Sequence, residues 1–296
     1  MRYSWRLVTM VDYHIHTPMC GHANGEPIQY VKEALAKGFK ELGFSDHIIL
    51  HVNRREYSMP IDKVADYVAK IEEVMNISSS LGCQVRLGAE VDYSEEKVEE
   101  IRALLGKYPF DYVLGSVHSI GDWFFDDPRY AYRYAEVDLE CLYRDYFILL
   151  SKAIESRLFD VIAHPDLVKK FGFKPKVELK GLYAEAIEAL RKNDICIEVN
   201  TSGLRKPVRE IYPSKDFLIM CHRAGVPVTL GSDAHNPMEV GMDFDKALAL
   251  LKDVGYEEIV LFSKRKKSFL KISDLKFPSA EAESMRKVYF HSFSQN

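Results

Sequence analysis

The sequence predicts an α/β barrel in which parallel strands alternate with helices. Seven short apolar runs, rich in β-branched and aromatic residues, follow one another along the chain, and amphipathic helix patterns separate them. Six of the seven runs end in His, Asp or Glu. A parallel barrel brings the carboxyl ends of its strands together at one face, so these side chains should converge on one pocket. The runs are 10–16, 41–47, 84–90, 112–118, 159–166, 195–200 and 226–235.

Amphipathic patterns between these runs predict the outer helices. The first begins at Pro27 and ends before Gly38, an asymmetry typical of helices, and Ser94 is expected to cap the third. A last apolar run at 258–262 is expected to be an eighth strand or an edge piece. We expect one domain over 1–296, with 264–296 as a C-terminal wrap-around segment. The helices are expected at 27–37, 61–75, 95–105, 136–156, 178–192, 215–223 and 242–252.

Composition narrows the class of protein. The 296 residues are 47% hydrophobic, ample for a large buried core, and the net charge of −4 provides no basic surface for nucleic acid. The five cysteines form no CxxC pair, which fits reduced thiols in the cytoplasm. The start of the chain shows no secretory signal, and no apolar run is long enough to span a bilayer. We therefore expect a cytoplasmic protein whose partner is a small molecule, with no nucleic acid and no membrane.

The residues at the strand ends are typical metal ligands. His14 and His16 are two apart on a strand, so both imidazoles face the same side, and Glu90 ends a strongly apolar strand where an unpaired carboxylate is costly. Taken singly, each has a structural alternative, such as a hydrogen-bonded histidine or a buried ion pair. His51 stays unassigned, and Cys20 is expected to be a free thiol near the site. His22 lies in a Gly-rich loop and, taken alone, would be a solvent-exposed histidine. The strand-end candidates are His14, His16, His47, Glu90, His118, His164, Asp233 and His235.

In this order, the motifs resemble those of the polymerase-and-histidinol-phosphatase (PHP) superfamily. The similarity spans residues 10 to 240 and implies a distorted seven-stranded (β/α) barrel. The motifs are His14-Ile15-His16, His22, Ser45-Asp46-His47, Gly88-Ala89-Glu90, Gly115-Ser116-Val117-His118, Ala163-His164-Pro165-Asp166 and Gly231-Ser232-Asp233-Ala234-His235.

The resemblance also implies three divalent metals. The first would be held by His14, His16, Glu90 and Asp233, the second by Glu90, His118 and His164, and the third by His22, His47 and His235. Zn, Mn and Fe all suit these ligands, so the sequence does not identify the metal. Asp46 and Asp166, which adjoin candidate histidines, are expected to orient them.

The size of the chain and the segment 197–206 resemble the stand-alone histidinol-phosphate phosphatases of that superfamily. This narrower resemblance implies a phosphoric monoester hydrolase that converts L-histidinol phosphate to L-histidinol and phosphate in histidine biosynthesis. A hydroxide bridging two metals would attack phosphorus, and Glu90 and Asp233 would serve the reaction through the metals. Either Asp233 or a metal-bound water would protonate the leaving group, and both alternatives stay open.

Substrate contacts are expected from two places. Arg205 is the candidate phosphate clamp, because a guanidinium binds two phosphate oxygens at once, and Lys169 is a weaker candidate. The stretch 119–133 is the longest irregular one and follows the fourth run. Within it, Trp123 and Asp127 are candidates to bind the imidazole and ammonium groups, although its aromatic side chains equally suit a role in pinning the loop.

Three other functions compete with this interpretation. A phosphoesterase or 3′–5′ exonuclease acting on nucleotides would keep the metals and change the substrate. An amidohydrolase also begins with H-x-H in a barrel, but it usually carries a bridging Lys on the fourth strand, where this chain has His118. A non-catalytic metal-binding module is disfavoured because the ligand set is complete. The oligomeric state stays open.

Overall fold

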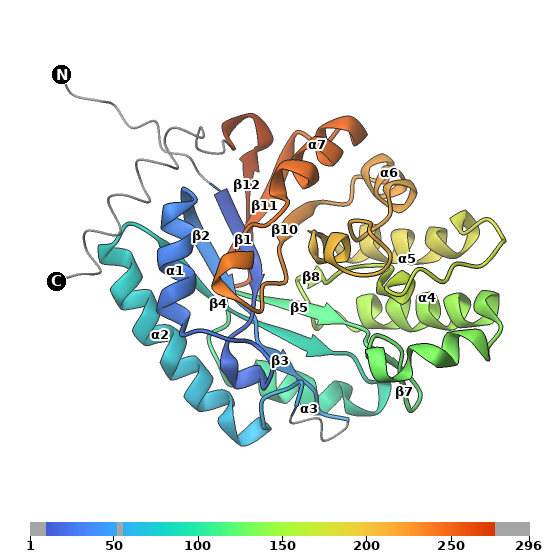
Figure 1. Cartoon of the computed structure of the whole chain (residues 1–296), viewed down its shortest axis with the longest axis horizontal. Helices are drawn as coiled ribbons and strands as arrows, with labels where there is room; N and C mark the ends of the chain where they lie inside the picture. Colours follow the sequence, from blue (N-terminus) through green and yellow to red (C-terminus); the bar gives the residue numbers. More distant parts are fainter. Residues whose placement is uncertain (1–9, 52–55, 276–296) are drawn as a thin grey trace.

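Seven parallel strands form a nearly closed barrel with helices outside it (Figure 1). The computed structural model describes residues 10–51 and 56–275. Each strand pairs with the next one along the barrel, so the expected parallel (β/α) barrel is confirmed. In spatial order the strands are β1 (Met10–Ile15), β2 (Phe39–Phe44), β4 (Gln84–Asp92), β5 (Tyr112–Ser116), β8 (Val161–Ile162), β9 (Cys196–Asn200) and β10 (Val228–Gly231).

The barrel closes between β1 and the segment that follows β10. The backbone N–H of His16 donates to the Ala234 carbonyl at 2.9 Å, and the Ala234 N–H donates to the His14 carbonyl at 3.1 Å. A short strand, β3 (His47–Ile48), pairs with β4 at the same end and places His47 opposite Glu90. The candidate metal-binding residues therefore meet at the carboxyl ends of the strands.

Seven α-helices surround the barrel, and all seven expected helices are present with ends shifted by a few residues. The first begins at Pro27 as expected, and Gly38 follows it with a positive φ of 83°. Ser94 precedes a 3-10 turn, η3 (Glu95–Lys97), but makes no side-chain cap bond, so the expected cap contact is wrong. The helices are α1 (Pro27–Ala36), α2 (Val64–Ser80), α3 (Val98–Leu105), α4 (Leu139–Glu155), α5 (Lys180–Asn193), α6 (Lys215–Arg223) and α7 (Phe244–Val254).

Tyr112 packs across three neighbouring strands inside the barrel. A Cβ on Gly43 would lie 2.1 Å from the Tyr112 hydroxyl oxygen, and a Cβ on Gly88 would lie 2.3 Å from Tyr112 Cζ. Both positions therefore exclude larger residues. Its hydroxyl donates to the carbonyl of Tyr13 at 2.6 Å. The tight interior fixes β1, β2 and β4, the strands that carry the first candidate ligands, relative to one another.

Two segments differ from expectation. The run 258–262 is not an eighth barrel strand: β11 (Glu258–Ser263) pairs antiparallel with β12 (Lys266–Lys271) in a separate hairpin. Residues 276–296 of the expected wrap-around segment lie outside the described residues.

The stretch after β5 is not irregular, since it holds a hairpin of β6 (Ser119–Ile120) and β7 (Trp123–Phe124) and a 3-10 helix, η4 (Pro128–Ala135). Within the described residues, every helix is too short or too polar to cross a bilayer.

Candidate metal centre

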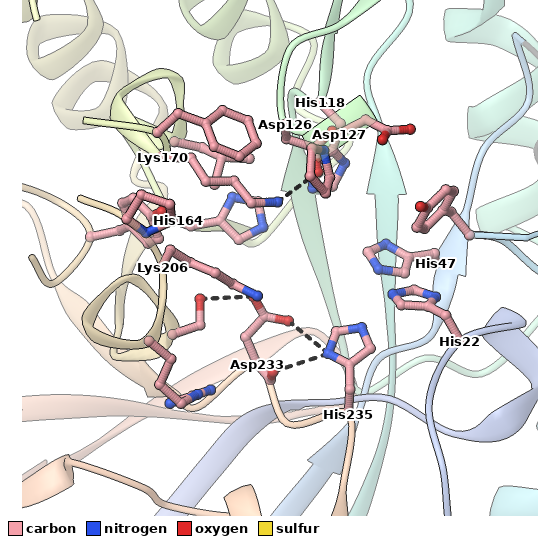
Figure 2. A pocket seen from close by; sticks show the side chains of 18 of the residues that line it. His22, His47, His118, Asp126, Asp127, His164, Lys170, Lys206, Asp233 and His235 are labelled. Atoms are coloured by element: carbon pink, nitrogen blue, oxygen red, sulfur yellow. Dashed lines mark hydrogen bonds and ion pairs between the residues drawn. The ribbon is translucent and has the colours of Figure 1, made fainter. Parts of the chain in front are cut away.

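All nine candidate ligands gather at the carboxyl end of the barrel. In Figure 2, His22 and His47 lie at the right of the pocket, His164 at the left, His118 at the top, and Asp233 and His235 along the lower edge. His14, His16 and Glu90 are fully buried behind these side chains, at the ends of β1 and β4. The eight ligands predicted from strand ends thus lie at one site, and His22 joins them from the loop after β1.

Glu90 lies between two groups of histidines and turns one carboxylate oxygen toward each. Its Oε1 is 2.8 Å from His164 Nε2 and 3.4 Å from His118 Nε2. Its Oε2 is 3.1 Å from His14 Nε2 and 3.6 Å from His16 Nε2. A carboxylate in this position can bridge two metal ions, each also held by a pair of imidazoles.

Asp233 completes the group around His14 and His16. Its Oδ1 lies 3.3 Å from His16 Nε2 and 3.8 Å from His14 Nε2. Burial opposes ionisation, yet His14, His16 and His235 hold the pKa of Asp233 well below its ordinary value. The same balance, with His47, His14 and His118 as partners, holds the pKa of Glu90 low. Both carboxylates are therefore anionic and able to bind cations.

A third group consists of His22, His47 and His235, whose nitrogens lie within 4.8 Å of one another. The ring centroids of His22 and His235 are 4.3 Å apart. Burial favours the neutral imidazole and lowers the pKa of His22 to about 4 and that of His235 to about 3. A neutral imidazole is the form that binds metals.

Several buried ring nitrogens fit metal binding because they have no protein partner. Both nitrogens of His16, Nδ1 of His47 and Nε2 of His235 lack a hydrogen-bond partner among the described residues. His47 Nδ1 is only 2.8 Å from Glu90 Oε2, but the contact does not have hydrogen-bond geometry. Unpaired buried polar atoms are costly, and a bound cation would satisfy them. The nitrogen and oxygen donors suit Zn, Mn or Fe.

The sequence analysis missed two buried carboxylates that contact candidate ligands. Asp92 lies 2.5 Å from Nδ1 of His118, and Glu198 lies 2.7 Å from Nδ1 of His14. Burial opposes protonation of His118, but Asp92 and Glu90 outweigh it and raise its pKa to about 10. Metal binding must then displace a proton from His118. No signal in the sequence pairs these carboxylates with particular histidines, because each contact joins residues far apart in the chain.

The two aspartates that were expected to orient histidines form their hydrogen bonds with other residues. Asp166 accepts a hydrogen bond from the Ser214 N–H at 2.7 Å and pairs with Lys169, so its expected role is wrong. Asp46 accepts from the backbone N–H of Thr17 at 2.5 Å. It lies 3.8 Å from His16 Nδ1, which is too far for a hydrogen bond.

A pocket of about 470 Å³ opens beside the histidines, and three cationic side chains line it: Lys170, Arg205 and Lys206. Arg205 donates from Nη2 to the Ser232 carbonyl at 2.6 Å, whereas its buried Nη1 has no hydrogen-bond partner among the described residues. Burial and the nearby charge of Lys170 lower the pKa of Lys206. Cations crowded into one pocket favour an anionic ligand.

Two expected substrate contacts lie elsewhere. Lys169 is buried and bonds to Asp166 and the Ile211 carbonyl, at 3.1 Å and 2.9 Å, so the lysine that reaches the pocket is its neighbour Lys170. Trp123 is buried with its ring 5.0 Å from that of Tyr134. Both residues fall outside the described lining of the pocket, which corrects the expectation for them.

The remaining candidates near the pocket are partnered. Asp127 lines the pocket, but its carboxylate also accepts hydrogen bonds from Arg129. His51 lies 3.2 Å from the Ser119 hydroxyl and stacks on Phe124, which indicates a role in holding the hairpin after β5. Cys20 Sγ lies 3.4 Å from His22 Nδ1.

Comparison with known proteins decides the family. The model of the PHP domain matches residues 12–202, more than half of the chain. The chain belongs to the PHP domain family. The resemblance in the motifs is thereby confirmed, and the barrel is a PHP barrel.

Several relatives of this PHP chain are named histidinol-phosphatases. A "Probable histidinol-phosphatase" of Deinococcus radiodurans is 40% identical over 250 residues, 83% of this chain and 94% of that protein. A "Histidinol-phosphatase" of Bacillus subtilis is 28% identical, over 80% of this chain and 97% of that one. Among solved structures, the Lactococcus lactis histidinol phosphate phosphatase, complexed with Zn, L-histidinol and phosphate, has a TM-score of 0.75 at 25% identity. That match covers 87% of this PHP chain and 98% of the other.

Proposed function

We propose that this PHP chain is a metal-dependent phosphatase that hydrolyses L-histidinol phosphate to L-histidinol and phosphate. The proposal rests on the convergence of nine metal-binding side chains and three cations in one pocket. It is supported by the Deinococcus relative and by the Lactococcus structure, which binds Zn together with both products of this reaction. A cytoplasmic location goes with this biosynthetic role.

The site is suited to three divalent metals. His14, His16, Glu90 and Asp233 would hold the first, Glu90, His118 and His164 the second, and His22, His47 and His235 the third. Divalent metals bound there would lower the pKa of a water molecule and neutralise charge on phosphoryl oxygens. The geometry around Glu90, with one oxygen facing each pair of histidines, supports the sharing of this residue by two metals.

The chain's own cations would hold the phosphate. Arg205 is fixed by its bond to the Ser232 carbonyl and offers the unpartnered Nη1, so it can contact a phosphate oxygen without first breaking a protein contact. Lys170 and Lys206 line the same pocket and would add positive charge. A phosphate monoester dianion would therefore be bound between these cations and the proposed metal site, whose ligands His164, Asp233 and His235 line the same pocket.

The leaving group would occupy the rest of the pocket. Asp126 and Asp127 supply negative charge, and Tyr57 and Phe171 supply aromatic surface, all within the pocket lining. This combination suits an ammonium group and an imidazole, the two groups of histidinol. These acidic side chains would repel the further phosphates of a nucleic acid, which disfavours an exonuclease. The bridging position holds Glu90 instead of a lysine, which disfavours an amidohydrolase.

Comparison of two substrates tests the proposal. Wild-type protein should have a higher kcat/KM for L-histidinol phosphate than for phenyl phosphate, because only the former has a group to pair with Asp126. Asp126 lies 3.2 Å from the Lys170 ammonium, so its replacement also changes the charge near the phosphate. Asp126→Asn should lower kcat/KM for L-histidinol phosphate about tenfold more than for phenyl phosphate, a difference of about 1.4 kcal/mol. The exposed Glu155→Gln is the matched control. Equal rates on both substrates in wild-type protein would contradict the assignment of histidinol phosphate.

A further inference from the structure

We propose that Glu198 is a positioning residue that fixes the tautomer and orientation of His14, and so determines the affinity of the metal bound there. Glu198 lies on β9, the one strand whose end carries no candidate ligand, and it is 1% exposed. Its Oε1 lies 2.7 Å from His14 Nδ1. The role rests on the proposed metal site but is independent of which phosphate ester is hydrolysed.

The carboxylate of Glu198 links two strands that carry ligands. Besides its contact with His14 of β1, its Oε2 accepts a hydrogen bond from the backbone N–H of His164, which follows β8, at 2.7 Å. The Asn200 side-chain amide donates to the same oxygen at 3.0 Å. Three contacts therefore hold the two carboxylate oxygens, which leaves the carboxylate little freedom to turn.

An ionised carboxylate only accepts hydrogen bonds, so His14 must donate from Nδ1. When a metal takes the place of the second proton, the lone pair that binds it is on Nε2, the atom that lies 3.1 Å from Glu90 Oε2 and 3.8 Å from Asp233 Oδ1. Nε2 thus faces the proposed metal position. A carboxylate behind a metal-binding imidazole also makes its free nitrogen a stronger donor.

The neighbouring strand β10 leaves space for this pair. A Cβ built on Gly231 of β10 would lie 1.8 Å from Glu198 Oε1 and 2.7 Å from His14 Cβ. The φ of Gly231 lies outside the left-handed region, so its conformation does not itself call for glycine. The close approach of Glu198 and His14 supplies the reason for a glycine there.

The same arrangement recurs across the site. Asp92 lies 2.5 Å from Nδ1 of His118 and accepts a hydrogen bond from the Ser116 hydroxyl at 2.9 Å. His118 then turns its Nε2 toward Glu90 Oε1 at 3.4 Å. Each of the two groups that share Glu90 therefore has one histidine held from behind by a buried carboxylate.

Metal titration of Glu198→Gln tests the role. The full chain is stripped with a chelator, and Zn²⁺ is titrated in competition with a chromophoric chelator. Gln keeps the shape, but if its amide faces His14, the N–H of that amide drives His14 toward the wrong tautomer. We expect one bound Zn²⁺ per chain to weaken by about 10- to 100-fold, with the others unchanged. Nitrogen NMR of the Zn²⁺-loaded protein should show loss of the His14 Nδ1–H form.

Glu41→Gln is the matched control, because Glu41 is a mostly buried carboxylate that bonds to Arg86 at 2.8 Å instead of to a histidine. Its Zn²⁺ affinities should equal those of wild type. Unchanged Zn²⁺ binding and an unchanged His14 tautomer in Glu198→Gln would overturn the proposal. So would equal weakening of every Zn²⁺ with a lower Tm of the stripped protein, since that pattern indicates a role in barrel stability.

If Glu198→Gln does not fold, Glu198→Asp serves instead. It keeps the charge but withdraws the carboxylate by one methylene, so the same selective weakening is expected, and wild-type affinity would overturn the proposal. Zn²⁺ is the sole probe in these titrations. A negative result therefore leaves the hydrolysis of histidinol phosphate untouched, and failure to hydrolyse that ester leaves the tautomer result valid.

Discussion

Glu90→Gln should lower kcat/KM for L-histidinol phosphate by at least ~10², the loss typical of removing a key electrostatic group. Glu90 is fully buried, and its two oxygens face different pairs of histidines. Glutamine keeps the volume but removes the negative charge that two cations would share. The variant should also retain fewer metals per chain, because its amide nitrogen cannot act as a ligand.

Steady-state kinetics and elemental analysis of the same preparation measure both effects. Glu41→Gln again supplies the control, since it removes a mostly buried carboxylate that pairs with Arg86. It should leave metal content and kcat/KM close to those of wild type. Near-normal turnover in Glu90→Gln with a full metal complement would return Glu90 to a structural role.

Arg205→Ala should lower kcat/KM by about 10- to 150-fold, which corresponds to a charge-assisted contact of roughly 1.5–3 kcal/mol. Because the guanidinium would touch the phosphate and not the leaving group, the loss should be equal for L-histidinol phosphate and phenyl phosphate. Among the described residues, Arg205 donates one hydrogen bond, to the Ser232 carbonyl, and its Nε lies 3.8 Å from Glu239 Oε1, so its loss should leave the backbone in place.

Arg209→Ala is the matched control for Arg205→Ala, because Arg209 is an exposed arginine of the same segment that bonds to the Leu204 carbonyl. Its kinetics should resemble wild type. Arg205→Lys should recover only part of the activity, since an ammonium cannot form the two parallel contacts of a guanidinium. A loss confined to L-histidinol phosphate in Arg205→Ala would place Arg205 against the leaving group instead.

The ligand positions could be predicted because a parallel barrel converts sequence order into spatial convergence. Each run is a buried strand, and a charged or imidazole side chain at its end stands out against apolar neighbours. Glu198 could not be found in this way. It lies within the run 195–200 and resembles any strand residue, and its contact with His14 joins residues far apart in the chain. Only the packing of β9 against β1 and β10 reveals it.

Directions of side chains within turns were also beyond the sequence. Lys169 and Lys170 are consecutive, yet one is buried against Asp166 and the other lines the pocket. Asp166 has a positive φ of 67°, and a 3-10 turn follows it. The direction of this turn determines which lysine reaches the pocket. From the sequence, Trp123 was equally suited to ligand binding and to loop packing. In the structure its ring packs against the ring of Tyr134, so it has the packing role.

The hairpin near the C-terminus lacked its usual signal. Tight turns between antiparallel strands often carry Asn-Gly or Asp-Gly, because two residues need positive φ. Here Lys264 and Arg265 adopt φ values of 51° and 62°. The basic run 264–267 therefore resembled a solvated segment, and β12, the second strand of this hairpin, was not predicted.

Metal reconstitution with L-histidinol phosphate as substrate tests the central claim most directly. The chain is stripped with a chelator, and phosphate release is measured as Zn²⁺ or Mn²⁺ is added back, with metal content determined at each point. The stripped protein should be inactive, and activity should rise until more than one metal is bound per chain. Full turnover by the stripped protein, or recovery of activity on other esters but not on L-histidinol phosphate, would contradict the assignment.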